Sequence, residues 1–231
     1  MKNIIIDQKI FELYPETSIA IIKLSGFVNS HNLTETILRD AEKYVRSHYN
    51  KPILELPEIK DWRDTYKQLH IKKGTRVSSE ALIKRVLKGG LLPSINPLVD
   101  IYNSISLKYV FPCGGEDLKM TQGDINLTFA NGLEEFKMIG SSINEPPTAG
   151  EVVYKDELGC LCRCWNWREA DRTKLTGQTT DAILVIESLN ASRLNELNNA
   201  VSELKELCEI HLEATVSYEI LNKKTQSWRL E

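Results

Sequence analysis

One short stretch of the chain combines side chains and backbone groups that could bind a substrate and act on it. Asn103 lies on the polar side of a segment with helical spacing, and Gly114 and Gly115 follow a break that contains a proline. Glycines let a ligand approach the backbone closely. Two carboxylates, Glu116 and Asp117, come directly after them. We therefore expect this stretch to form the wall and lip of a pocket.

A helix must position these groups, and the sequence contains residues typical of a helix start. Asn96 can cap it, with Pro97 as its first residue. The apolar residues that recur at helical spacing as a buried stripe are Val99, Tyr102 and Ile105. The hydrogen-bonding residues that share the adjacent face are Asp100, Asn103 and Ser106.

A second cluster alternates aromatic and polar side chains in Trp165-Asn166-Trp167-Arg168. In a strand, this alternation puts both tryptophans on one face and Asn166 with Arg168 on the other. Such a surface suits a flat ligand or a nucleic-acid base. Tryptophans buried in the core, with the arginine paired to a nearby carboxylate, would explain the same pattern.

These motifs resemble the B3/B4-type editing domain of the bacterial phenylalanyl-tRNA synthetase beta subunit. Its pattern, Val-Val-Asp, Asn, Leu and then Gln-Pro-x-His-x-Phe-Asp, is echoed at Val99, Asp100, Asn103, Leu107, Pro112 and Asp117. The segments that look like stand-alone relatives of that domain are Ser78-Ser79-Glu80-Ala81-Leu82, Arg85-Val86-Leu87-Lys88-Gly89 and Trp165-Asn166-Trp167-Arg168. The resemblance covers residues 60–190.

In the synthetase, this domain hydrolyses tyrosine mischarged on the phenylalanine tRNA. The resemblance therefore implies a trans-editing aminoacyl-tRNA hydrolase that acts on mischarged tRNA, holds the amino-acid moiety in a pocket and needs no cofactor or metal. The family's pocket histidine falls at Gly114 and its aromatic residue at Glu116. The glutamate that reads the tyrosine hydroxyl lies near Glu187, one residue further from Thr180 than in the family. The resemblance therefore does not identify which amino acid is removed or which tRNA carries it.

An aminoacyl ester is already activated, so a positioned water and backbone donors can hydrolyse it without a protein nucleophile. We expect the N–H groups of Gly114 and Gly115 to meet the ester carbonyl, while Asn103, Asp117 and Asn166 orient substrate and water. Arginine suits a phosphate or carboxylate. The other candidate substrate-binding residues are Ser79, Glu80, Glu116, Arg168, Thr180 and Glu187.

The net charge of −3 argues against a broad surface that coats phosphates, and we expect no DNA partner. A local basic patch would suffice for tRNA. The candidate RNA-binding residues are Lys72, Lys73, Arg76, Lys84 and Arg85. The same residues could equally form a solvated helix face.

Helical and strand-like segments are mixed rather than regularly alternating, which predicts an α+β fold with mixed sheets and packed helices. Helical spacing covers 33–44, 57–69, 78–88 and 192–207, and strand patterns cover 3–6, 18–24, 125–129, 151–154, 160–165, 182–187 and 214–220. We expect a single compact domain over 1–231, in which 60–190 is the core that resembles the synthetase domain and 1–59 and 191–231 are integrated flanks. No apolar run approaches the roughly 20 residues that cross a bilayer, and an apolar leader is missing, so we expect a cytoplasmic protein without a membrane partner.

The sequence lacks the motifs GxxxxGK, GxGxxG, HExxH and GxSxG. Their absence argues against a kinase, a dehydrogenase, a zinc protease and a common esterase. Cys160, Cys162 and Cys164 have single-residue gaps, which do not fit a zinc site. Cys113 is the one candidate nucleophile, and no histidine lies near it in sequence. Two alternatives stay open: a non-catalytic module that binds tRNA or a free amino acid, and a hydrolase of small esters or amides unrelated to tRNA.

Overall fold

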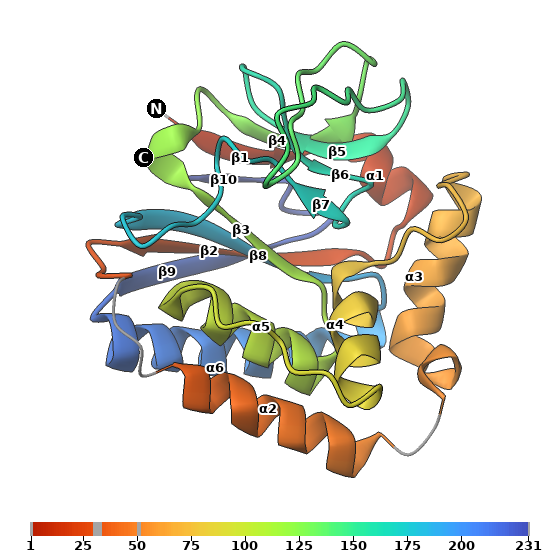
Figure 1. Ribbon diagram of the computed structural model, residues 1–231. Coiled ribbons are helices and arrows are strands. Elements are labelled where there is room, and N and C mark those ends of the chain that lie inside the picture. Colours follow the sequence, from red (N-terminus) through yellow and green to blue (C-terminus); the bar gives the residue numbers. More distant parts are fainter. Residues whose placement is uncertain (1, 30–33, 50–51, 231) are drawn as a thin grey trace.

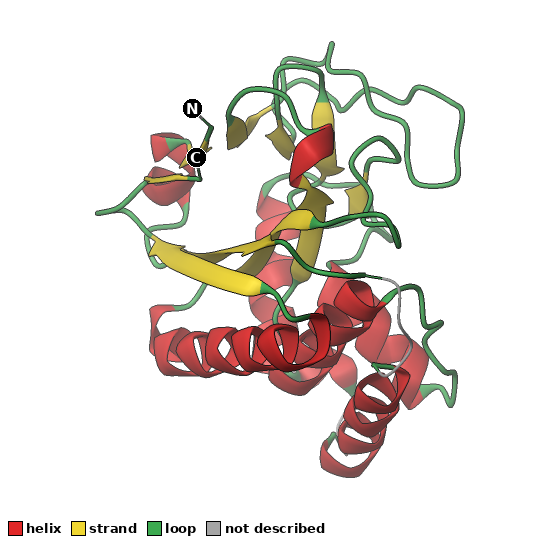
Figure 2. Cartoon of the chain, turned by 90° about the vertical axis from the view of Figure 1, so that its left-hand side faces the viewer, coloured by secondary structure: helices red, strands yellow, loops and turns green. Residues whose placement is uncertain are grey.

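The computed structural model describes residues 2–29, 34–49 and 52–230. It stacks three layers: a six-stranded sheet, a four-stranded sheet and a layer of helices (Figure 1). A view turned by 90° shows the long helices gathered beneath the strands, with extended loops on the opposite side (Figure 2). The α+β class predicted from the sequence is confirmed.

The six-stranded sheet has the order β10-β1-β4-β5-β6-β7. Its strands are β1 (Asn3–Ile6), β4 (Ile125–Phe129), β5 (Val152–Lys155), β6 (Cys160–Arg163), β7 (Arg168–Glu169) and β10 (Ser227–Arg229). β1 and β4 run parallel, and the other pairs are antiparallel. The short strand β7 forms one edge.

The four-stranded sheet has the order β3-β8-β2-β9 and is antiparallel throughout. Its strands are β2 (Ser18–Ser25), β3 (Cys113–Asp117), β8 (Asp181–Ser188) and β9 (Thr215–Leu221). β3 is an edge strand, like β7 in the other sheet. The functional candidates around Gly114 therefore lie on a sheet edge.

Helices cover the outer face of the four-stranded sheet and one side of the molecule (Figure 1). The α-helices are α1 (Gln8–Leu13), α2 (Glu35–His48), α3 (Pro57–Gln68), α4 (Ser78–Leu87), α5 (Pro97–Tyr109) and α6 (Leu194–Leu212). The 3-10 turns are η1 (Ile53–Glu55), η2 (Leu118–Met120) and η3 (Ala191–Arg193). Of the predicted helix at 33–44, Leu33 lies outside the described residues. None of the described helices is long and apolar enough to cross a membrane.

Strand β8 divides the core because its side chains alternate between two faces. Ala182, Leu184 and Ile186 pack with α5 and α6. Ile183 and Val185 face the six-stranded sheet, and Glu187 follows them on that face. A polar residue thus lies at the end of an apolar row between the two sheets.

The predicted start of α5 is confirmed: Asn96 Oδ1 accepts a hydrogen bond from Val99 N at 3.1 Å, with Pro97 as the first helical residue. The predicted strand at 160–165 is too long. Its last two residues, Cys164 and Trp165, have φ values of 49° and 69°. A left-handed backbone cannot continue a strand, so the chain turns there and the expected alternation ends.

Candidate functional site

A cavity of about 420 Å³ lies between the two sheets, with residues of α4 and α5 in its lining. Apolar side chains dominate its walls; those from the strands include Ile4, Ile125, Leu161, Ile183 and Val185. The edge strands β3 and β7 form another wall. A largely apolar cavity of this size that holds a few polar groups is typical of a small-ligand site.

The polar groups in the wall include two glutamates from the two edge strands. Glu116 on β3 is 8% exposed, and its Oε2 atom has no hydrogen-bond partner. Glu169 on β7 reaches across and accepts a hydrogen bond from Gly115 N at 3.3 Å. Burial raises the pKa of Glu169 to about 7. Burial and repulsion from Glu169 hold the pKa of Glu116 well above its usual range.

Gly114 makes the position of Glu169 sterically feasible. A Cβ atom on Gly114 would lie 2.8 Å from Glu169 Oε1. Gly115 has a different reason to be glycine, because a Cβ there would lie 2.3 Å from Leu184 Cδ2 and 3.1 Å from the Ile183 carbonyl oxygen. The first glycine leaves space on the cavity side, and the second allows β3 to pack on β8.

The N–H groups of the two glycines do not point the same way. Gly115 N–H leaves the sheet edge toward Glu169. Glu187 N donates to Pro112 O, so the strand alternation turns Gly114 N–H toward β8. The expected pair of donors to one carbonyl oxygen is therefore not found, because Gly114 N–H points toward β8 and Gly115 N–H donates to Glu169.

Asn103 lines the cavity from α5, as expected for a substrate-orienting residue. No described residue makes a hydrogen bond with its side chain. Its neighbours on the predicted polar face are engaged elsewhere. Asp100 accepts from Ser94 Oγ at 2.5 Å, and Ser106 Oγ donates to Phe111 O at 2.7 Å. Only Asn103 of that face is free to meet a ligand.

Asp117 lies outside the cavity lining. Its carboxylate accepts from Lys119 N at 3.0 Å and from Thr179 Oγ1 at 2.7 Å, so it caps the turn after β3. The expected role for Asp117 in orienting water does not fit this position. Thr180 lies beside it on the outer side, where its Oγ1 accepts from Lys119 Nζ at 2.6 Å.

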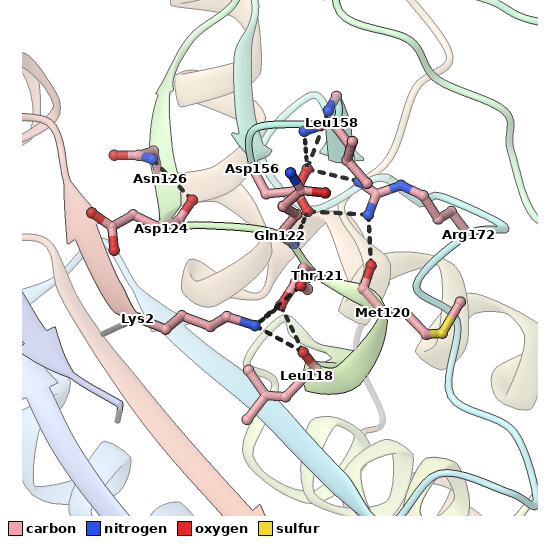
Figure 3. Close-up of polar contacts among 11 residues, drawn as sticks. Lys2, Leu118, Met120, Thr121, Gln122, Asp124, Asn126, Asp156, Leu158 and Arg172 are labelled. Carbon is pink, nitrogen blue, oxygen red and sulfur yellow. Dashed lines mark hydrogen bonds and ion pairs between the residues drawn. The ribbon is translucent and has the colours of Figure 1, made fainter.

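Further polar contacts fix this turn between β3 and β4 (Figure 3). Lys2 Nζ donates to Leu118 O at 2.9 Å and to Thr121 Oγ1 at 2.7 Å. Arg172 forms a bidentate pair with the buried Asp156, at 2.8 and 3.1 Å. These contacts hold the end of the strand that carries Glu116.

Glu187 lies behind the cavity wall and accepts three hydrogen bonds. Its Oε1 accepts from Tyr154 Oη at 2.5 Å and Trp165 Nε1 at 2.8 Å, and its Oε2 accepts from Asn166 Nδ2 at 2.7 Å. Tyr66 Oη lies 2.9 Å from Asn166 Oδ1. Burial nevertheless raises the pKa of Glu187 to about 7. Asn166 lines the cavity, and this network engages its amide oxygen and one of its two amide N–H groups.

The chain turns at Cys164 and Trp165, so the four residues from Trp165 to Arg168 do not form the expected strand, yet all four line the cavity. Trp165 is fully buried and packs edge-on against Trp62, with ring centroids 5.3 Å apart. Trp167 and Arg168 instead lie at the mouth of the cavity. The prediction of a strand through Trp165 and Asn166 is therefore wrong, although Asn166 and Arg168 both line the cavity.

A second hollow of about 380 Å³, here called the basic groove, adjoins the mouth. Its basic residues are Lys72, Lys73, Arg76 and Arg168. It shares Ser78, Ala81, Trp167 and Arg168 with the cavity. The structure thus brings three predicted RNA-binding residues together beside the mouth.

The remaining predicted residues lie outside both hollows. Glu80 is buried and pairs with Arg63 at 2.6 Å and with Arg76 at 3.5 Å, so it supports the basic groove from beneath. Ser79 is fully buried inside α4. Arg85 Nε donates to Leu91 O at the end of that helix, and Lys84 lies near it on the last turn.

Sequence reasoning missed Glu169 as a site residue. It belongs to a two-residue strand beyond an irregular turn, and its neighbour at the site, Gly115, is 54 residues away in the chain. Strand alternation within 165–169 could not reveal a contact that depends on two sheets meeting. Only the family's aromatic position, occupied here by Glu116, marks an unusual acidic site in the sequence.

Cys113 also lines the cavity, and burial raises the pKa of its thiol. A protonated thiol is a poor nucleophile. None of the described residues that line the cavity is a histidine. Over the described ranges, no group of three or more His, Cys, Asp or Glu side chains could hold a metal ion.

The chain thus has an α+β fold with a largely apolar cavity between two sheets. A family model described as the B3/4 domain matches residues 61–216, more than half of the chain. The chain belongs to the B3/4 domain family. This match confirms the relationship expected from the sequence and continues to residue 216 rather than 190.

Among solved structures, the chain is similar to an N-terminal fragment of the phenylalanyl-tRNA synthetase beta subunit from Pyrococcus horikoshii. The two share 11% identity and a TM-score of 0.47, over 93% of this chain and 50% of that one. The chain thus spans half the length of that fragment. No curated protein matches the chain.

Proposed function

We propose that this protein is a trans-editing aminoacyl-tRNA hydrolase, which removes the amino acid from mischarged tRNA in the cytoplasm. One observation carries the proposal: the cavity and the basic groove share the lining residues Ser78, Ala81, Trp167 and Arg168, of which Ala81 and Arg168 are exposed. An aminoacyl-tRNA carries a small amino-acid moiety on the end of a phosphate backbone. The cavity would take the amino acid, and the groove would take the phosphates beside it.

Glu169 is the group best suited to activate water in the cavity. Its pKa of about 7 leaves part of the population ionised at neutral pH, which is the range where a carboxylate serves as a general base. The hydrogen bond from Gly115 N holds the carboxylate in place. Water activated here would attack the ester carbon without a covalent intermediate.

Asn103 would orient the substrate, because its side chain lines the cavity and has no described partner to give up. An amide can donate to the ester carbonyl or accept from the attacking water. Positioning of this kind lowers the barrier by holding reacting groups in place before the reaction. The engaged amide of Asn166 would shape the wall rather than contact the ester.

The basic groove would bind the tRNA end through Lys72, Lys73, Arg76 and Arg168. The Arg168 guanidinium lies 5.4 Å from the centre of the Trp167 ring. An arginine beside an aromatic ring is well suited to a nucleotide, because it can meet the phosphate while the ring stacks on the base. A small patch of this kind is compatible with the net charge of −3.

The proposal is tested by a deacylation screen with purified protein and a panel of correctly and incorrectly charged tRNAs. Loss of aminoacyl-tRNA is followed against buffer. Selective turnover of one or a few mischarged species would support the proposal and name the substrate. Turnover of free amino-acid esters with indifference to tRNA would show a small-ester hydrolase. Binding of tRNA without turnover would leave a non-catalytic binding module.

A further inference from the structure

The Glu116 carboxyl group is buried in the cavity wall beside the Thr173 hydroxyl, which acts to lower its pKa but does not reach hydrogen-bonding geometry. It is 8% exposed, and its Oε2 atom makes no hydrogen bond within the described chain. A buried polar group in this state costs free energy that a bound ligand can recover. The strand register places Glu116 on the same face of β3 as Gly114, which is the face toward the cavity.

The surroundings of Glu116 supply a second carboxyl group, and the one basic side chain among the described lining residues, Arg168, is exposed and lies against the Trp167 ring. Glu169 lines the same wall, so two carboxyl groups share one largely apolar space. Arg172 acts on Glu116 electrostatically, but its guanidinium is already engaged with Asp156 in a bidentate pair. None of the described lining residues is a buried cation, so a ligand could supply the positive charge that would balance an ionised pair.

A ligand with a hydroxyl group could satisfy one oxygen of Glu116 but would leave the repulsion between the two glutamates. A protonated amine would satisfy Glu116 and also reduce the repulsion, because it donates up to three hydrogen bonds and carries a positive charge. Charge-assisted hydrogen bonds in a dry site are also the stronger kind. The rest of the wall would accept the apolar stem of such a ligand.

We propose that the cavity selects a ligand that carries an ammonium group, with Glu116 as its receptor and Glu169 beside it. The inference rests on the proposed function, since it names the part of the aminoacyl group that the cavity would recognise. Two sources share this chemistry. They are the α-ammonium next to the ester and an ammonium at the end of the amino-acid side chain.

Four amides of matched shape separate these sources when their affinities are measured by titration calorimetry. L-norleucinamide carries only the α-ammonium, Nα-acetyl-L-lysinamide carries only the side-chain ammonium, L-lysinamide carries both, and Nα-acetyl-L-norleucinamide carries neither. We expect at least one of the two singly charged probes to bind about tenfold tighter than the neutral one. Which of the two binds tighter identifies the source.

The variant Glu116→Gln keeps the size of the side chain and should abolish this preference. Glu209→Gln removes the same charge from the exposed face of α6 and should preserve it. Equal binding of charged and neutral probes to the wild-type protein would overturn the inference, as would no binding of any probe. A preference that survives in Glu116→Gln would also overturn it. The comparison on the wild-type protein needs no variant to fold.

These probes contain no ester and no tRNA, so their binding is independent of hydrolysis. If the protein binds the ammonium probes but deacylates no tRNA, the ammonium site is supported and the proposed function is wrong. If it deacylates tRNA but binds charged and neutral amides alike, the proposed function is supported and the ammonium site is wrong.

Discussion

The buried carboxylate of Glu187 links the residues behind the cavity wall through three hydrogen bonds. Its three donors come from Tyr154, Trp165 and Asn166, all on the other sheet or the turn that follows it. A carboxylate can accept all of these bonds, because both of its oxygens are acceptors. The residue that resembles the family's hydroxyl-reading glutamate therefore has its hydrogen bonds filled from within the protein.

Replacing Glu187 with glutamine should destabilise the protein while changing its size little. The amide nitrogen would face the Asn166 amide nitrogen, so donor would meet donor. We expect the free energy of unfolding to fall by about 2 kcal/mol. Urea denaturation measures it. Tyr154→Phe, which removes one donor and leaves the carboxylate with two, should cost only about 1 kcal/mol. Equal stability of Glu187→Gln and wild type would show that the network is not needed.

At the scale of elements, strand β3 is shaped by two glycines with different tasks. Gly115→Ala should be the more damaging change, because the new Cβ would meet Leu184 Cδ2 at 2.3 Å and backbone at 3.1 Å. Overpacking of this kind costs about 1–3 kcal/mol. Gly114→Ala would meet only the end of the Glu169 side chain. Thermal unfolding of both variants tests this order, and it is wrong if Gly114→Ala is the less stable protein.

The sequence predicted elements well wherever periodicity is regular. The helix from Pro97 was predicted with its Asn96 cap, because capping chemistry and an apolar stripe are both local signals. The turn at Cys164 and Trp165 was missed, because neither residue type favours a left-handed backbone. Tertiary packing decides that conformation, and the sequence pattern alone predicted a strand through it.

The sequence pattern could place a residue relative to its own helix or strand, but it could not show which distant segments meet at the cavity. Asn103 was placed in a pocket wall from its helical face, and it lies there. Asp117 was placed there from its spacing, but a strand alternates its faces and the residue caps a turn instead. Glu169 was missed because its contact with Gly115 joins two sheet edges that no local pattern connects. Contacts between distant segments set the chemistry of this cavity.

At the scale of the whole molecule, four basic side chains line the groove that adjoins the cavity. The double variant Lys72→Gln/Lys73→Gln should weaken tRNA binding, because both side chains are exposed in the basic groove. The slope of log affinity against log salt should become shallower by about 0.7 for each lost phosphate contact. Filter binding at several salt concentrations measures this.

A matched control uses another pair of adjacent exposed lysines. Lys223→Gln/Lys224→Gln lies in the turn between β9 and β10, at the sheet edges opposite β3 and β7. It removes the same charge from outside the groove. Should both double variants weaken tRNA binding alike, the groove would have no special role.

Stability should depend on pH through the buried carboxyls. The pKa values of Glu169 and Glu187 are both raised by burial to about 7 from 4.5. The folded protein thus keeps protons that the unfolded chain releases, so the free energy of unfolding should fall as pH rises from about 4.5 to 7. Each group contributes at most about 1.4 kcal/mol per pH unit.

The variant Glu169→Gln should flatten this pH dependence, because it removes one of the three carboxyls with a raised pKa and also the repulsion that raises the pKa of Glu116. Urea denaturation at pH 5, 6 and 7 measures the slope on wild type and variant, with Glu209→Gln as the exposed control. A slope that is unchanged in Glu169→Gln would mean that this carboxyl titrates in its ordinary range.

The most direct test of the account is single-turnover deacylation of the tRNA that the screen identifies, by wild type and by Glu169→Gln, with tRNA affinity measured alongside. Loss of a general base should lower the rate by about 100-fold or more and leave the affinity for uncharged tRNA unchanged, because Glu169 does not line the basic groove. The wild-type rate should rise with pH around 7 and then level off, as the Glu169 carboxyl ionises. A variant that hydrolyses the ester at the wild-type rate would contradict the account.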